Sequence, residues 1–507
     1  MARTYKKINK ISHAIKYYES YLEVKPNDSE ILNSLASCYV KNKKSSLALN
    51  CYKKLLKKNP ENDVYLINYA VALFETLNFN EAVKILENLL DKNINNKVAF
   101  SKYLFNQNYN PKINYDKINT YIKKFYHINK KENLNIINFC FEKNPKKINV
   151  GFVSPDFRNH PLGYAALNLI KCLKIYNLNL FAYYNFNIED NLTEEFKKNF
   201  NYFYNIEKLN DEQTINKIRS DGIHILIDLA GYTLNNRLSI FSHNPAPIQA
   251  SWLGYLPTTG LKEITYKIGD PHIYSKEIEK NFSEKILRLP NIWSDFTMPV
   301  NIIKEKPNFN EIENEIIFGS FVTLRKINEK VISLWSKVLK KFSNTKIYLK
   351  SPELHDTEIK KKLENEFFNH GVNSNKLILE ESSDYKTYLK SYSKVHITLD
   401  PFPWNGVTTS FESVWMGVPV FCLKGDSPYS RCSYSINKNL KMDDWIAIDE
   451  NDYLTKLETI LSNKKKLLQT KKNLRDTALK NNLFNSKEFA RNFCEMLNET
   501  WKNFEKK

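Results

Sequence analysis

The segment from Lys394 to Leu423, KVHITLDPFPWNGVTTSFESVWMGVPVFCL, places the strongest constraint on the fold of this chain. Val395–Leu399 is short, apolar and rich in β-branched residues, and the amphipathic run Ser410–Met416 follows it after a polar turn. Gly417–Val418–Pro419 then separates that run from a second apolar stretch. This order predicts a strand, a loop, a helix and a second strand, as in a parallel α/β sheet.

The loop of this unit is a candidate phosphate site, because it opens at the carboxyl edge of the sheet and leads into a helix N-terminus. Gly406, next to Asn405, allows close approach of the backbone, and the hydroxyls of Thr408 and Thr409 can donate to phosphate oxygens. Glu412, three residues into the helix, can accept from sugar hydroxyls. A capping box with Thr409 as N-cap and Glu412 at N3 explains the same spacing, so both interpretations stay open here.

The first part of the chain repeats with a period of 34 residues. Small residues recur at Ala14, Ala48 and Ala82, and prolines at Pro26 and Pro60. This period is typical of the tetratricopeptide repeat, a pair of helices that stacks into arrays. We expect full repeats at 29–62 and 63–96, a partial repeat before them, and a degenerate or capping repeat at 97–145.

Helical arrays of this kind present concave surfaces to peptides or partner proteins. A groove of two and a half repeats is small, so a packing or dimerisation arm is the alternative interpretation.

A second pattern begins at Lys146, with KKINVGFVSPDFRNHPLG. Ile148–Val153 reads as a strand and Tyr164–Leu173 as an apolar helix, the start of a doubly wound domain. The turn between them contains Asp156, Asn159, His160 and Pro161. A histidine in a loop at a strand end, next to a carboxylate, is a candidate for proton transfer or for hydrogen bonding a ligand.

The alternation of strands and helices continues along the chain. The strand Ile223–Leu229 leads into a loop with Gly231, Tyr232 and Thr233, and a later loop contains Leu253, Gly254 and Tyr255. His224 lies within the strand, which favours a packed core histidine over a functional one.

A proline-containing linker at 289–307, with Pro290, Pro299 and Pro307, predicts a domain boundary. The strand Glu315–Ser320 then opens a further domain, and Lys326 follows it just before an apolar helix. A lysine at such a turn is a point charge suited to a diphosphate. The predicted domains are 1–145, 146–300 and 312–507, the last closed by helices at 452–482 and 485–504.

These blocks, in this order, resemble the protein O-GlcNAc transferase family from Lys146 onward, behind a generic repeat region. The resemblance implies a GT-B type α/β fold, with two Rossmann-like domains preceded by the all-α repeats. It also implies inverting transfer of N-acetylglucosamine from UDP-GlcNAc, the donor substrate, to Ser or Thr hydroxyls of proteins. No cofactor and no metal are expected, and the repeat region is expected to bind the protein acceptors without taking part in the chemistry.

The resemblance also assigns site residues. It places His160 beside the reacting sugar, Lys326 and the Gly406–Thr409 loop on the diphosphate, and Glu412 on the ribose. The remaining donor- and substrate-binding residues that it implies are Asn159, Pro161, Gly231, Tyr232, Thr233, Leu253, Gly254, Tyr255, Thr323 and Asn405.

Some positions depart from the animal members of the family. Histidines stand there in place of Val407 and Tyr388, a glutamine in place of Thr323, and an aspartate in place of Glu412. The identity of the sugar therefore stays open, since a related plant branch transfers fucose from GDP. A transferase for glycan or lipid-linked acceptors, and a repeat scaffold without turnover, are the further alternatives.

The composition limits the partners and the compartment. The net charge of +19 would suit an anion, but the excess is mostly scattered lysine, so we expect no nucleic acid partner. The seven cysteines show no C-x-x-C pair, which argues against a disulfide framework and for a reducing cytoplasm. We expect neither a signal peptide nor a membrane span. The sequence leaves the oligomeric state open.

Overall fold

The computed structural model describes residues 1–129, 134–296, 315–481 and 483–506. Two predicted domain boundaries, at 300 and 312, lie outside these residues, as do Pro299 and Pro307. The chain forms two compact units, Met1–Ile113 with Asn310–Trp404, and Asn114–Phe309 with Asn405–Lys507. The three-domain division stays a prediction.

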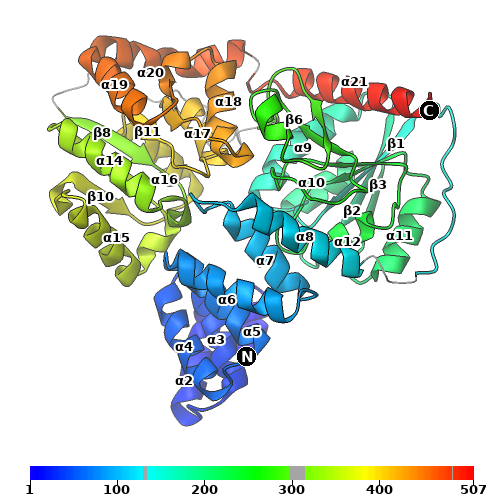
Figure 1. Cartoon of the computed structure of the whole chain (residues 1–507), viewed down its shortest axis with the longest axis horizontal. Coiled ribbons are helices and arrows are strands. Elements are labelled where there is room, and N and C mark those ends of the chain that lie inside the picture. The colour runs from blue at the N-terminus through cyan, green and yellow to red at the C-terminus, as the bar shows by residue number, and fades with distance from the viewer. Residues whose placement is uncertain (130–133, 297–314, 482, 507) are drawn as a thin grey trace. The chain divides into compact units, whose positions relative to one another are not determined.

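The first part of the chain is helical and keeps the predicted period (Figure 1). Its helices are α1 (Ala2–Lys7), α2 (Ile11–Val24), α3 (Ser29–Lys41), α4 (Ser45–Lys58), α5 (Asp63–Glu75), α6 (Phe79–Lys92), α7 (Lys97–Gln107) and α8 (Tyr115–Asn129). Asp28 and Asn62, one repeat apart, cap α3 and α5 with their side-chain oxygens. Ala14, Ala48 and Ala82 are fully buried, as expected for small residues where helices cross.

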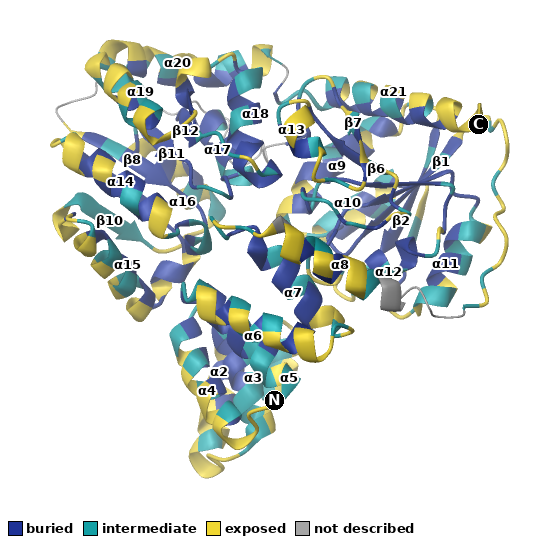
Figure 2. Cartoon of the chain, in the orientation of Figure 1, coloured by how far each residue is buried: buried dark blue, intermediate teal, exposed yellow. Residues whose placement is uncertain are grey.

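The first sheet has seven parallel strands in the order β3-β2-β1-β4-β5-β6-β7. The strands are β1 (Ile148–Ser154), β2 (Leu178–Tyr184), β3 (Tyr202–Asn205), β4 (Ile225–Asp228), β5 (Ile248–Ser251), β6 (Tyr266–Gly269) and β7 (Lys285–Arg288). The helices between them are α9 (Pro161–Leu173), α10 (Asn191–Asn199), α11 (Asp211–Ser220), α12 (Leu238–Phe241) and α13 (Lys276–Glu279). The central strands β1, β2 and β4 are mostly apolar and buried, as the middle of a parallel sheet requires (Figure 2).

The second sheet has six strands in the order β10-β9-β8-β11-β12-β13. The strands are β8 (Ile316–Ser320), β9 (Thr345–Lys350), β10 (Leu377–Glu380), β11 (Ile397–Leu399), β12 (Val420–Leu423) and β13 (Ile446–Ala447). The helices are α14 (Glu329–Lys341), α15 (Thr357–Asn369), α16 (Tyr385–Lys390), α17 (Thr408–Trp415), α18 (Cys432–Asn439), α19 (Glu450–Ser462), α20 (Lys464–Lys480) and α21 (Ser486–Glu505). Helices followed by two Rossmann-like parallel sheets confirm the predicted fold class.

The last helix, α21, packs against α9 of the first sheet's domain. Its Phe493 ring lies 4.9 Å from Trp252, and its Trp501 ring lies 4.6 Å from His224. His224 is buried, and its Nδ1 accepts from the Asn149 N–H at 2.9 Å. The prediction of a packed core histidine is therefore confirmed.

Candidate active site

The first sheet has its topological switch between β1 and β4, since the chain continues from these two neighbours in opposite directions. Ligands of open parallel sheets bind at such a point, beyond the carboxyl ends of the strands. The turn with His160 follows β1, and the loop with Gly231 follows β4. The fold thus brings these two predicted site segments to one edge of one sheet.

His160 is the N-cap of α9, and its Nδ1 accepts from the Leu162 N–H at 3.2 Å. The helix begins at Pro161, three residues before the predicted start, and this difference makes the histidine a cap. Burial and Arg158 lower the pKa of His160, while Asp156 opposes them. The neutral ring with an acceptor at Nδ1 carries its proton on Nε2, so His160 can donate a hydrogen bond to a ligand.

Asp156 supports this turn from a buried position, 3.6 Å from His160 Nδ1. Arg158 donates to Asp156 Oδ1 at 3.1 Å and stacks its guanidinium over Phe186 at 4.5 Å. Asn159 uses its side-chain oxygen within the protein, accepting from the Tyr164 hydroxyl at 2.9 Å. The residues around His160 therefore hold the turn in shape.

A buried network that the sequence did not reveal fixes the loops after β4 and β5. Asp228 accepts from the Ala230 N–H at 3.1 Å and from the Gly231 N–H at 2.8 Å. Lys267 donates to the Tyr255 carbonyl and to Ser251 Oγ at 3.1 Å, and Ser251 donates to Asp228 at 3.2 Å. Burial lowers the pKa of Lys267 to about 8, although Glu284 and Asp228 oppose this effect.

Two glycines let these loops touch. Gly231 has φ +54°, and a Cβ there would lie 2.1 Å from the Cβ of Tyr255. A Cβ on Gly254 would lie 2.1 Å from the Leu229 carbonyl oxygen and 2.8 Å from Leu162 Cδ1. The start of α9 and the loops after β4 and β5 are therefore in contact.

The other predicted residues of this region lie in the same loops. Tyr232 is buried and donates to the Thr259 carbonyl at 2.7 Å, and its ring lies 5.4 Å from Tyr255. Thr233 has its Oγ1 buried without a hydrogen-bond partner, and Leu253 has φ +72°. Among the predicted residues of this edge, Thr233 is thus the one with an unused polar atom turned inward.

Tyr429 links the predicted donor loop to these loops, and the sequence reasoning missed it. Its carbonyl accepts from the Asn405 N–H at 3.1 Å. Its hydroxyl lies 3.4 Å from both the Gly254 carbonyl and the Leu256 N–H. Tyr429 lies in the short helix Pro428–Arg431 of the block GDSPYSRCSYSIN, and nothing in that local pattern marks it. Asn405 also accepts from the Ser433 N–H at 3.3 Å, so its side chain shapes the loop.

The capping-box interpretation of the donor loop is wrong. The helix α17 begins at Thr408, its N-cap is Val407, and the cap makes no side-chain hydrogen bond. Thr409 donates instead to the Gly406 carbonyl at 3.2 Å, and Glu412 is buried. Val407 has φ +55°, an unfavourable conformation for a β-branched residue that costs roughly 1–3 kcal/mol and is common at ligand sites. The start of α17, without a side-chain cap, is therefore the candidate phosphate site of this loop.

The second sheet has its switch between β8 and β11. Lys326 follows β8 in the short helix Leu324–Lys326, and its Nζ lies 5.2 Å from the Trp404 ring, which follows β11. Asn328 donates to the Phe402 carbonyl at 2.6 Å and caps α14. The predicted lysine therefore lies where the loops after the two central strands meet.

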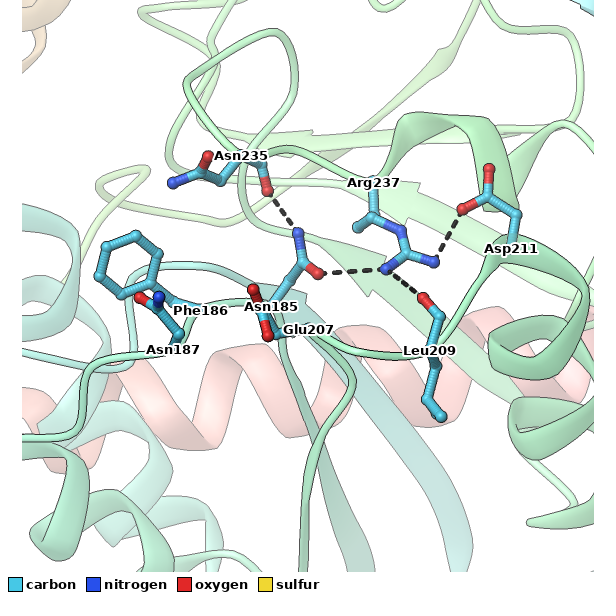
Figure 3. A pocket seen from close by; sticks show the side chains of 8 residues that line it. All are labelled: Asn185, Phe186, Asn187, Glu207, Leu209, Asp211, Asn235 and Arg237. Atoms are coloured by element: carbon cyan, nitrogen blue, oxygen red, sulfur yellow. Dashed lines mark hydrogen bonds and ion pairs between the residues drawn. The ribbon is translucent and has the colours of Figure 1, made fainter.

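A separate cavity of about 500 Å³ lies beyond β2 and β3 (Figure 3). Its lining residues are Asn185, Phe186, Asn187, Glu207, Leu209, Asp211, Asn235 and Arg237. Arg237 donates to Asp211 at 2.7 Å and to Asn185 at 3.1 Å, so its guanidinium is engaged within the protein. None of the predicted site residues lines this cavity.

Two findings concern the described residues only. No group of three or more His, Cys, Asp or Glu side chains among them is arranged to hold a metal ion. None of the helices described has the length and apolar character needed to cross a bilayer.

Comparison with known families decides the relationship. Residues 80–298 and 294–493 match the model of glycosyl transferase family 41. The chain belongs to this family. Residues 7–89 also match a model described as anaphase-promoting complex, cyclosome, subunit 3, in agreement with the helical repeats.

Similar proteins come from plants and from Thermobaculum terrenum. A protein of Solanum lycopersicum named probable UDP-N-acetylglucosamine–peptide N-acetylglucosaminyltransferase SPINDLY is 26% identical over 70% of this chain and 39% of its own length. The Hordeum vulgare protein of the same name is 27% identical over 69% and 38%. The chain thus spans about two fifths of these relatives. An O-GlcNAc transferase structure from Thermobaculum terrenum matches with a TM-score of 0.91 and 21% identity, covering 100% of this chain and 96% of that one.

Proposed function

We propose that the protein is an inverting glycosyltransferase that moves N-acetylglucosamine from UDP-GlcNAc to serine or threonine hydroxyls of proteins. The observation that carries the proposal is the Gly406–Thr409 loop, which leads into α17 without a side-chain cap in a chain of family 41. The name of the Solanum lycopersicum relative describes that protein as a probable transferase of N-acetylglucosamine from UDP-N-acetylglucosamine to peptide.

The chemistry of the transfer identifies the groups that matter. The acceptor oxygen bonds to the anomeric carbon from the face opposite UDP, the bond between that carbon and the diphosphate breaks, and the hydroxyl proton is released. Negative charge grows on the departing UDP. Lys326, the hydroxyls of Thr408 and Thr409 and the first N–H groups of α17 stabilise this charge. The proposed reaction therefore uses neither a cofactor nor a metal.

His160 has a different part in this proposal. Its Nδ1 accepts from Leu162, so Nε2 is the protonated nitrogen and donates to an oxygen of the sugar or of the acceptor. A neutral ring with this tautomer is a hydrogen-bond donor and not a base. Replacing it should leave UDP affinity unchanged and lower transfer.

The repeat region is proposed to bind the protein acceptors, and the enzyme is proposed to act in the cytoplasm. Calorimetric titration with UDP, GDP, UDP-GlcNAc and GDP-fucose tests the donor. Of the two nucleotide sugars, UDP-GlcNAc should bind more tightly than GDP-fucose. Tighter binding of GDP-fucose would overturn the uridine assignment. Mass spectrometry of a proteome co-expressed with the protein, or with its Lys326→Ala variant, tests the acceptor class, because added hexosamine on proteins should require the lysine.

A further inference from the structure

The repeat region contacts the second sheet's domain through a group of charged side chains that includes two buried carboxylates. Lys43, in the turn between α3 and α4, lies with its Nζ 2.9 Å from Glu353 Oε1 and 3.5 Å from Glu75 Oε2. Glu75 ends α5 and is 7% exposed, and Glu353 follows β9 and is 2% exposed. Carboxylates so far from water need a partner for their charge.

Glu353 also contacts the segment that precedes Lys326. It accepts from the Thr323 hydroxyl at 3.1 Å and from the Leu324 N–H at 3.4 Å. Burial by itself would raise the pKa of Glu353, but Lys43, with help from Ser351 and Arg325, lowers it to about 2. The charge that fixes Thr323 is therefore held in place by a lysine of the repeat region.

A second chain of contacts reaches Lys326 from the other side. Glu75 Oε1 lies 3.5 Å from Arg325 Nη1, and the guanidinium of Arg325 lies 5.1 Å above the Tyr109 ring. Tyr109 stacks on Trp404 with ring centroids 4.3 Å apart, and Trp404 is the ring beneath Lys326. Glu75 and Tyr109, which precede α8, therefore contact Arg325, next to Lys326 in the chain, and Trp404, beneath its ammonium group.

We propose that Glu75 and Lys43 are positioning residues of the transfer reaction, which hold the loop Thr323–Lys326 in the geometry that meets the donor diphosphate. This role goes beyond binding acceptors, and it rests on the proposed function of Lys326. Transfer reactions are sensitive to such placement, since a displacement of about 1 Å can cost roughly 100-fold in rate.

The test uses full-length variants and a control at the same contact. Glu75→Gln and Lys43→Met remove a charge of the network, whereas Lys43→Arg keeps it. Lys362→Met is the control, because Lys362 donates to the Thr76 carbonyl at 3.1 Å and to Asn78 at 2.8 Å but contacts neither Arg325 nor Glu353. Each variant is assayed for UDP affinity by calorimetry, for kcat and acceptor KM in transfer, and for melting temperature.

Glu75→Gln and Lys43→Met should each weaken UDP binding by about tenfold and lower kcat, with the acceptor KM unchanged. Lys43→Arg should restore both values, and Lys362→Met should lower the melting temperature without changing UDP affinity. Folded Glu75→Gln and Lys43→Met proteins with wild-type UDP affinity and kcat would overturn the proposal. Equal losses of UDP affinity in Lys362→Met would also overturn it. A wild-type protein that does not bind UDP would instead reject the proposed function.

Discussion

Two substitutions can separate the role of His160 as the N-cap of α9 from its proposed role as a hydrogen-bond donor in the transfer reaction. In His160→Ala the Leu162 N–H at the start of α9 loses its acceptor. In His160→Asn a shorter side chain still offers an oxygen to that N–H, and asparagine is among the best N-cap residues. Both variants lack the Nε2 donor.

The expected magnitudes follow from these contacts. Loss of an N-cap hydrogen bond costs about 1 kcal/mol of stability, so His160→Ala should unfold more easily and His160→Asn should match the wild type. Removal of one donor that acts in the transition state costs roughly 3–4 kcal/mol, or on the order of 100- to 1000-fold in kcat. Both variants should therefore lose transfer equally.

The assay pairs urea unfolding with transfer at saturating donor, and calorimetry of UDP checks that the phosphate site is intact. His160→Asn is the decisive variant, because its fold and its cap are preserved. Wild-type kcat in this variant would refute the role of Nε2 and leave His160 as a helix cap.

The same contact predicts a pH dependence. The folded-state pKa of His160 is depressed, so its neutral form contributes stability above the ordinary value near 6.5, and this is lost as the pH falls through the lower folded value. Protonation also occupies Nδ1 and breaks the bond from Leu162. Wild-type transfer should be constant from about pH 8 down to the ordinary histidine pKa near 6.5 and fall only at lower pH, as the pH passes the depressed pKa of His160, and a profile without that fall would contradict the tautomer.

Three further predictions concern other residues. Lys326→Ala should lower kcat by about 100- to 1000-fold and weaken UDP by less, whereas exposed Lys330→Ala, one turn away, should change neither. Burial lowers the pKa of Lys267 to about 8, so between about pH 8 and 10.5 the unfolded chain binds more protons than the folded one and the free energy of unfolding rises with pH. This rise should be larger in the wild type than in Lys267→Met by up to about 3 kcal/mol. The same dependence of unfolding free energy on pH in both proteins would contradict this. Tyr429→Phe should cost about 1 kcal/mol of stability and raise the donor KM through movement of Gly254, and an unchanged KM would limit the hydroxyl to a structural role.

Much of the fold was accessible to sequence reasoning, because periodicity and strand order act locally. The 34-residue period located α3 to α6, and the apolar runs located the central strands of both sheets. Boundaries were less accurate at His160, where a histidine is an unusual N-cap and Pro161 is the first helical residue. At Thr409 the spacing favoured a capping box, but Val407, with a positive φ, is the N-cap, so the helix starts two residues earlier than that box requires.

The residues that hold the site were harder to foresee. Asp228, Lys267 and Tyr429 each make contacts with segments distant in the sequence, at Ser251, Tyr255 and Gly254, and nothing in their local pattern marks them. Lys43 and Glu75 are two among many charges of a chain with 75 Lys and Arg against 56 Asp and Glu. Only the fold shows that their partners include the buried carboxylate of Glu353 and the guanidinium of Arg325, next to Lys326 in the chain.

The two sheets balance the charge of a buried carboxylate with lysines from different parts of the chain. Each has a buried carboxylate at a strand end, Asp228 or Glu353, that fixes a loop at the switch by accepting from its N–H groups or hydroxyls. In the first sheet the matching lysine, Lys267, comes from the same sheet. In the second it is Lys43, from the repeats. A carboxylate left without its lysine is destabilised by burial, so the hydrogen bonds that Glu353 accepts from Thr323 and Leu324 depend on Lys43, a residue of the helical repeats.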